Sequence, residues 1–146
     1  MGNNHHWKRT YLQRPKLELA RVLLVHPELA PRLTLQTILQ ASGYRVEMAA
    51  SIPEALVKLD ENQYDLVLSE AECGSSEGGR KLLAYARVKS YKPATALITA
   101  SEPYGPTPGR SNVSIHTENL PILLGKVAEL IGIRAIRRYR PLSQAV

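Results

Sequence analysis

The chain has 146 residues, of which 44% are hydrophobic and 22% are charged, a composition typical of one globular domain with a substantial core. Its single cysteine excludes an intramolecular disulfide, and no apolar run approaches the roughly 18 residues that a membrane-spanning helix needs. Because the amino terminus also lacks the apolar core of a signal peptide, the sequence predicts a soluble, cytoplasmic protein with no membrane partner.

The net charge of +6 belongs to the two ends of the chain. Residues 1–21 carry five basic side chains and one acid, and residues 133–146 carry four arginines and no acid. The span between them holds ten basic and twelve acidic residues. Basic ends can dock on nucleic acid or on an acidic partner, or can simply keep a protein soluble, and these alternatives stay open here.

From residue 20 onward, apolar strands alternate with amphipathic helices. The run Leu66-Val67-Leu68 is typical of a parallel strand that is buried on both faces. Ser51 and Glu54 have the spacing of a capping box at a helix start. In chain order we expect a strand at 20–25, a helix at 28–42, a strand at 44–49, a helix at 53–61, a strand at 64–70, a helix at 80–90, strands at 94–100 and 113–116, and a helix at 120–136.

The alternation predicts a parallel sheet that is flanked by helices and joined by right-handed crossovers. The segment 101–112 holds three prolines and two glycines, so a regular helix is not expected there. Gly132 is expected to kink or end the last helix. The predicted organisation is a basic N-terminal arm at 1–19, one domain at 20–132, and a basic tail or helix extension at 133–146.

The chain resembles the receiver domain of bacterial two-component response regulators, the CheY-like family, over about residues 20–131. The resemblance rests on the first strand and helix, on Ala49 followed by Glu54-Ala55-Leu56, on the stretch from Tyr64 to Glu70, and on Ala96-Leu97-Ile98-Thr99-Ala100. It implies a flavodoxin-like α/β three-layer sandwich with a five-stranded parallel sheet in the order 2-1-3-4-5. The short segment 101–112 implies that the fourth helix is shortened or lost.

The resemblance also implies where a phosphorylation site would lie. Receivers hold Mg²⁺ with a pair of acids after the first strand, and they use an aspartate after the third strand, a Thr or Ser after the fourth and a Lys after the fifth. In this sequence those positions fall on His26 and Pro27 (with Glu28 one place further on), on Glu70, on Thr99, and on Thr117 or alternatively His116.

This residue set predicts a degenerate receiver, or pseudo-receiver. Mg²⁺ prefers oxygen ligands in near-octahedral geometry, and His26 and Pro27 supply no side-chain oxygen. Phosphoryl transfer relies on the metal and a cation to stabilise charge on the moving group. We therefore expect no phosphotransfer, no enzymatic activity and no cofactor.

Several roles for Glu70 remain open. Its carboxylate can act as a permanent negative charge that resembles the phosphorylated state, or it can cap the following loop or pair with a base such as Arg80. His26, Glu70 and His116, with Glu72 added, are a conceivable Zn²⁺ set, although no local ligand spacing supports it. Cys73 is not expected to be a nucleophile, because neighbouring carboxylates oppose thiolate formation.

The predicted function is protein–protein interaction in signal transduction or transcriptional regulation. The expected partner is a signalling kinase, a regulator or the transcription machinery, and homodimerisation stays open. The alternative is a nucleic-acid-associated protein that uses its basic termini on a receiver-like scaffold. Its candidate contacts, which would serve a protein partner equally, are Arg134, Arg137, Arg138 and Arg140 on an extension of the last helix.

Overall fold

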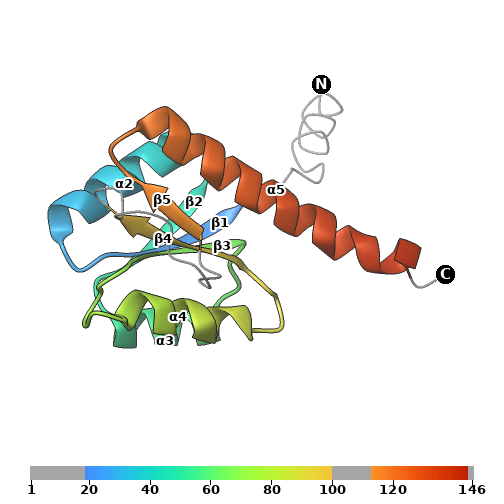
Figure 1. Cartoon of the computed structure of the whole chain (residues 1–146), viewed down its shortest axis with the longest axis horizontal. Helices are drawn as coiled ribbons and strands as arrows, with labels where there is room; N and C mark the ends of the chain where they lie inside the picture. Colours follow the sequence, from blue (N-terminus) through green and yellow to red (C-terminus); the bar gives the residue numbers. More distant parts are fainter. Residues whose placement is uncertain (1–18, 100–112, 145–146) are drawn as a thin grey trace, which may run out of the picture.

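The computed structural model of the chain describes residues 19–99 and 113–144. Its centre is a five-stranded, fully parallel sheet in the order β2-β1-β3-β4-β5, which confirms the predicted topology (Figure 1). The strands are β1 (Arg21–Val25), β2 (Arg45–Ala49), β3 (Leu66–Glu70), β4 (Ala94–Thr99) and β5 (Val113–His116).

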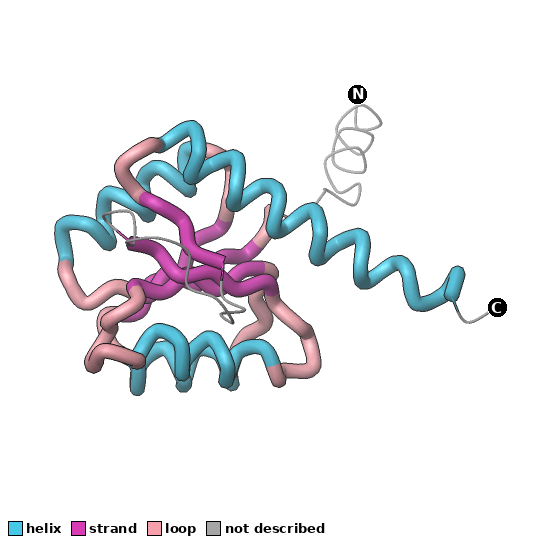
Figure 2. The backbone as a smooth tube through the Cα atoms, in the orientation of Figure 1, coloured by secondary structure: helices cyan, strands magenta, loops and turns pink. Residues whose placement is uncertain are grey.

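Helices cover both faces of the sheet, so the predicted three-layer sandwich is confirmed. Helices α3 and α4 lie on one face, and α2 and α5 lie on the other (Figure 2). The expectations about the arm at 1–19 and the fourth helix at 101–112 fall on segments outside the described residues, apart from residue 19. The helices are α2 (Leu29–Ala41), α3 (Ile52–Glu61), α4 (Gly78–Arg87) and α5 (Leu120–Gln144).

The core consists of two aliphatic clusters, one on each face of the sheet. Because successive side chains of a strand point to opposite faces, Leu23 and Val25 pack under α3 and α4, while Val22 and Leu24 pack under α2 and α5. Both faces of β3 are therefore buried, as the uninterrupted apolar run predicted.

The sequence pattern places Leu29, Leu33, Leu35, Ile38 and Leu39 largely along one apolar stripe of α2, and the first half of that prediction was wrong. Leu29 and Leu33 are 59% and 43% exposed, whereas Leu35 and Leu39 are buried. At roughly 100° per residue, Leu29 and Leu33 lie about a quarter-turn or more round the helix from the buried pair. When five aliphatic residues are spread this widely around a helix, the sequence alone does not identify which side of the helix packs against the sheet.

The N-cap role predicted for Ser51 at the start of α3 is confirmed, while Glu54 reaches back one residue further than in a standard capping box. The Ser51 hydroxyl accepts a hydrogen bond from the backbone N–H of Glu54 at 3.3 Å. The Glu54 carboxylate accepts one from the N–H of Ala50 at 3.0 Å. One unsatisfied donor of the first helical turn and one donor of the preceding residue are thereby paired, which fixes how the chain leaves the β2 edge.

Helix α4 begins two residues earlier than predicted, at Gly78. A Cβ atom on Gly79 would lie 2.4 Å from the Glu70 carbonyl oxygen, and one on Gly78 would lie 1.7 Å from the Cys73 carbonyl oxygen. The two glycines therefore belong to the helix and allow its first turn to pack against the loop after β3. This close approach holds the backbone directly behind Glu70.

Helix α5 continues through Gly132 to Gln144, so Gly132 does not end it. Its carboxyl-terminal half runs past the sheet (Figure 1). Within the described ranges, no helix combines the length and the hydropathy that crossing a bilayer would require.

Candidate functional site

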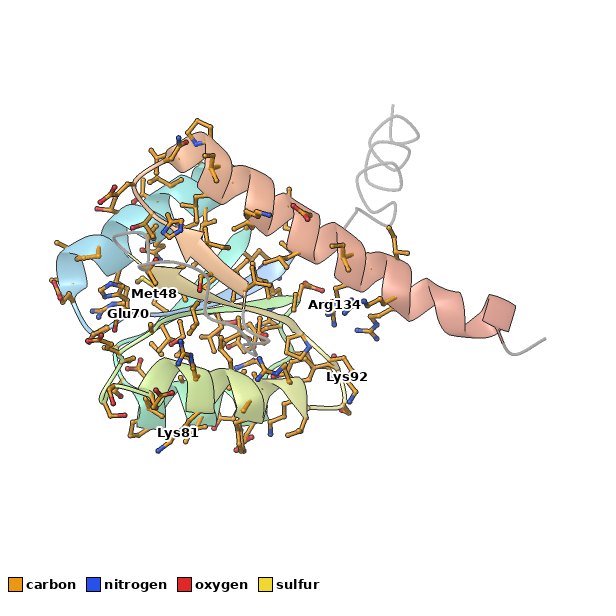
Figure 3. The ribbon with its side chains drawn as sticks, in the orientation of Figure 1. Met48, Glu70, Lys81, Lys92 and Arg134 are labelled. Carbon is orange, nitrogen blue, oxygen red and sulfur yellow. The ribbon has the colours of Figure 1, made fainter. Side chains whose placement is uncertain are left out.

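The parallel sheet brings the predicted site positions to its carboxyl edge. Val25 pairs with Ser69, so His26 and Glu70 follow at the same level of neighbouring strands. Thr99 pairs with His116 on the next two strands. Parallel α/β sheets place their ligands at this edge. Figure 3 shows Glu70 at this end of the sheet.

Glu70 is fixed by its backbone, while its carboxylate stays partly exposed. Its carbonyl oxygen accepts hydrogen bonds from the Cys73 N–H at 3.3 Å and the Ser69 hydroxyl at 3.1 Å. Arg80, the base considered as its partner, pairs with Glu77 at 3.4 Å instead. In the described part of the chain the Glu70 carboxylate has no hydrogen bond or ion pair, so its charge is available to a partner.

His26 is held as a neutral ring beside Glu70. Its Nδ1 accepts a hydrogen bond from the Glu28 backbone N–H at 3.1 Å, which assigns the proton of the neutral ring to Nε2. Burial lowers the pKa of the imidazole, whereas the carboxylates of Glu70 and then Glu28 raise it. Arg32 donates to the His26 carbonyl at 2.8 Å and so fixes the turn.

The two positions directly after β1, where receivers carry the acids that hold Mg²⁺, are His26 and Pro27, and neither side chain is a carboxylate. Pro27 is exposed and has no donor atom in its side chain, and the Glu28 side chain is exposed. Across residues 19–99 and 113–144, no three His, Cys, Asp or Glu side chains are placed to share a metal ion. The structure therefore gives the zinc alternative no support within those ranges.

At the ends of β4 and β5, an imidazole stands next to a hydroxyl. The Thr99 Oγ1 lies 3.1 Å from the His116 Nδ1. Thr117 is one residue further on, and its hydroxyl donates to the Thr99 carbonyl at 3.3 Å. His116 is thus the side chain beside the Thr99 hydroxyl, while Thr117 is turned toward the backbone.

Cys73 lies just behind the edge in the core, where it is 1% exposed. Burial raises the pKa of its thiol, and the Glu70 carboxylate raises it further. A buried thiol with a raised pKa has little thiolate at neutral pH, in line with the expectation that Cys73 is not a nucleophile.

The arginines of α5 fall into two groups. Arg134 is bound to the domain: its guanidinium donates to the Asp65 carboxylate at 2.5 Å and to the Tyr91 carbonyl at 2.6 Å. Arg137 and Arg138 are exposed. Arg140 lies on the helix, but its side chain is outside the described part.

Three further basic residues, Arg87, Lys92 and Lys126, lie around one hollow at the amino ends of β4 and β5, together with the arginines at 134, 137 and 138. We call it the basic hollow. Sequence reasoning missed these three, because they come from a helix end, a turn and α5, and no common spacing connects them. Their proximity could have been inferred from the sequence only by first predicting the strand order and then placing each turn at its end of the sheet.

Comparisons with known proteins point to one fold. No family model matches the sequence. A gliding motility regulatory protein of Myxococcus xanthus is 34% identical over 90 residues, and the chain spans 11% of the length of that protein while the match covers 62% of this chain.

Solved structures match over most of their length. A CheY-like response regulator receiver domain from Methanospirillum hungatei has a TM-score of 0.70 and 24% identity, covering 82% of this chain and 99% of that one. The response regulator TrrA of Thermotoga maritima, solved with Mg²⁺-BeF, has a TM-score of 0.65 and 28% identity over 77% of this chain and 99% of its own. A complex of the histidine kinase ThkA with the response regulator TrrA has a TM-score of 0.66 and 28% identity, and the match covers 77% of this chain and 98% of that one.

Proposed function

Because the chain has the fold of CheY-like response regulator receiver domains, a fold of signalling proteins, we propose that it acts as a pseudo-receiver that binds another protein without being phosphorylated. The observation that carries the proposal is the residue set at the carboxyl edge of the sheet. Glu70 stands at the end of β3, His26 and Pro27 follow β1, and His116 lies beside Thr99. The protein is on this account a binding module and not an enzyme.

The edge residues do not fit the Mg²⁺ ion that receivers use. Glu70 offers one carboxylate. His26 offers an imidazole whose Nδ1 already accepts a hydrogen bond from the Glu28 backbone N–H. Magnesium needs several oxygen ligands at short, near-octahedral distances. A single carboxylate between an imidazole and a proline does not meet that need, so no step through a metal is assigned.

The site also lacks a fixed cation for the moving phosphoryl group. The imidazole of His116 lies against the Thr99 hydroxyl at 3.1 Å, and imidazole is not permanently charged near neutral pH as lysine is. Glu70 also reaches further than aspartate by one methylene group. The three requirements of phosphotransfer (metal, cation and placed nucleophile) are therefore all weakened together.

What the edge does offer is a constant negative charge on a rigid support. The Glu70 carboxylate is partly exposed, and the backbone behind it is held by the close approach of Gly79. We propose that a protein partner recognises this charge and the surrounding edge. It would do so as it would recognise a receiver held permanently in a state that resembles the phosphorylated one. A signalling kinase, a regulator or a component of the transcription machinery fits this role.

The test is whether partner binding needs Glu70 and ignores phosphodonors. The tagged chain would be used to capture proteins from the cells that produce it, with and without a small phosphodonor, and the captured proteins would be quantified by mass spectrometry. We expect the same partner under both conditions, reduced capture by Glu70→Gln, and unchanged capture by Glu61→Gln, which alters an exposed acid at the end of α3. Capture that requires the phosphodonor would contradict the proposal.

A nucleic-acid role is the second candidate, favoured by the exposed Arg137 and Arg138 in the carboxyl-terminal half of α5. Removing the whole tail would also remove Arg134 and its bonds to Asp65, so the sharper variant is Arg137→Ala with Arg138→Ala. Duplex binding predicts a log–log salt slope that becomes shallower by about 0.9 for each phosphate that the variant no longer neutralises. Absence of DNA binding at low salt would exclude this role.

A further inference from the structure

The basic hollow lies at the other end of the sheet from Glu70. It is formed where the turn before β4 and the start of β5 face α5, and its volume is about 860 Å³. Figure 3 shows Lys92 and Arg134 at this end and Glu70 at the opposite one. Small-molecule sites typically measure about 300–1,000 Å³, so the hollow is large enough for a ligand of ordinary metabolite size.

The charge of the lining is strongly positive. Among the side chains described there, Lys126 has Glu129 as a partner at 3.6 Å, and Arg134 has Asp65. Lys92, Arg137 and Arg138 have no acidic partner within the described ranges. The lining combines one carboxylate, Glu129, with six cationic side chains, namely Arg87, Lys92, Lys126, Arg134, Arg137 and Arg138.

The walls of the hollow are held in place before any ligand arrives. The Arg134 Nε donates to the Lys92 carbonyl at 2.9 Å, which ties α5 to the turn before β4. Lys92 has a φ of +46°, in the left-handed region that residues other than glycine rarely adopt. On the other side, Arg87 donates to the Thr95 hydroxyl at 3.3 Å. Backbone strain of this kind is often retained at ligand sites, where it orients groups in advance.

Part of the lining of the hollow is apolar, which distinguishes it from a site that would bind only an anion. Aliphatic surface from the β4 and β5 starts faces aliphatic surface from α5. A bare phosphate or pyrophosphate would use only the cations, and a long duplex would lie across the opening without filling it. The apolar part of the lining is Pro93, Ala94, Val113, Leu130 and Ile133.

We propose that the basic hollow binds a nucleotide, with the phosphates on the cations and the base against the apolar part of the lining. Charge-assisted bonds from Arg137 and Arg138 would hold the phosphates, and Lys92 would close the site from the turn. The hollow uses none of the residues at the carboxyl edge. The proposal therefore stands or fails independently of the pseudo-receiver function.

The test is calorimetric titration of the full chain, at about 50 mM salt, with ATP, GTP, CTP and UTP, and with pyrophosphate and the free nucleosides for comparison. We expect at least one nucleotide to bind with one-to-one stoichiometry and at least tenfold more tightly than pyrophosphate or its own nucleoside. Lys92→Ala and Arg138→Ala should each weaken that binding about tenfold or more, which corresponds to roughly 1.4 kcal/mol. The matched control is Lys81→Ala, an exposed lysine on α4 that points away from the hollow (Figure 3).

Four results would overturn the proposal. The first is the absence of binding by all four nucleotides, and the second is pyrophosphate binding as tightly as they do, which would leave an anion site without base recognition. The third is equal weakening by Lys81→Ala. The fourth is tight binding of a single-stranded oligonucleotide with which no nucleotide competes, which would assign the surface to a nucleic-acid backbone.

Discussion

At the scale of single residues, the electrostatic link between Glu70 and His26 can be measured directly. Burial lowers the pKa of His26, and the Glu70 carboxylate is the strongest influence that raises it. Glu70→Gln removes that charge, so the pKa of His26 should fall further below its ordinary value. The imidazole resonances followed by NMR against pH report the change.

The matched control for this titration is Glu72→Gln, because Glu72 is exposed in the same loop and does not act on His26. The pKa of His26 should be the same in this variant as in the parent. An equal shift in both variants, or no shift in either, would show that Glu70 does not face His26 across the β1–β3 edge.

Two buried tyrosines offer a second comparison. The Tyr91 hydroxyl donates to the Leu59 carbonyl at 2.9 Å inside the core. The Tyr64 hydroxyl is buried and makes no hydrogen bond of normal geometry in the described part of the chain, although the side chains of Glu47 and Asn62 lie close enough to act on it. Burial, and then the Glu47 carboxylate, raise the pKa of Tyr64. Tyr91→Phe should therefore lower the free energy of unfolding by about 1 kcal/mol, because it leaves a buried carbonyl unpaired.

Tyr64→Phe should leave the free energy of unfolding unchanged or raise it, because it removes a polar atom that has no partner to lose. Urea denaturation of the two variants beside the parent measures both effects. Equal destabilisation by the two changes would mean that the Tyr64 hydroxyl is paired in solution.

At the scale of elements, the packing of α4 against the β3 loop depends on a glycine. A Cβ on Gly79 would lie 2.4 Å from the Glu70 carbonyl oxygen, a backbone atom that cannot move aside cheaply. Gly79→Ala should destabilise the fold by about 2 kcal/mol, as overpacking does. Gly132→Ala, which meets nothing within 4 Å in the middle of α5, should stabilise it by about 0.5–1 kcal/mol.

Thermal unfolding of the two alanine variants gives the comparison. Opposite signs are expected, since the same chemical change meets a crowded backbone in one helix and open space in the other. A Gly79→Ala variant as stable as the parent would mean that α4 does not start against the loop.

The anchoring of α5 is the other element-scale feature. Arg134 is bonded to the Asp65 carboxylate and to the carbonyls of Tyr91 and Lys92, and its side chain is only 11% exposed. Arg134→Met keeps the aliphatic stem but leaves Asp65 without its cation. It should lower the free energy of unfolding by about 2 kcal/mol, less than a fully buried pair would because Asp65 is one-third exposed.

Its control is Arg137→Met on the next turn, where the side chain is exposed; this change should stay within about 0.5 kcal/mol of the parent in chemical denaturation. If the two substitutions lower the free energy of unfolding equally, the hydrogen bonds of Arg134 do not hold α5 to the sheet.

The elements also show which parts of the fold the sequence determines locally. Strand β3 contains the continuous apolar run Leu66-Val67-Leu68, and the cap of α3 needs only Ser51 and Glu54, so both could be predicted. The buried face of α2 depends on how the helix sits on the sheet, and Leu29 and Leu33 were misplaced for that reason. The start of α4 at Gly78 depends on close packing that no local pattern reports.

At the scale of the whole molecule, the two ends of the sheet carry different chemistry. The carboxyl edge presents Glu70 beside a neutral His26, and the amino side presents the basic hollow. The site positions at the carboxyl edge could be predicted, because each follows a strand in the sequence. The hollow could not, because the turn and the helices that supply its cations meet only after folding.

The central claim is that the carboxyl edge has lost phosphotransfer, and intact-mass spectrometry after incubation with acetyl phosphate and Mg²⁺ tests it most directly. A phosphoryl group adds about 80 Da. We predict no adduct on the parent chain, and none on Glu70→Asp, because restoring an aspartate restores neither the acids at His26 and Pro27 nor a lysine at His116 or Thr117. A Mg²⁺-dependent adduct of about 80 Da located at Glu70 would contradict the account.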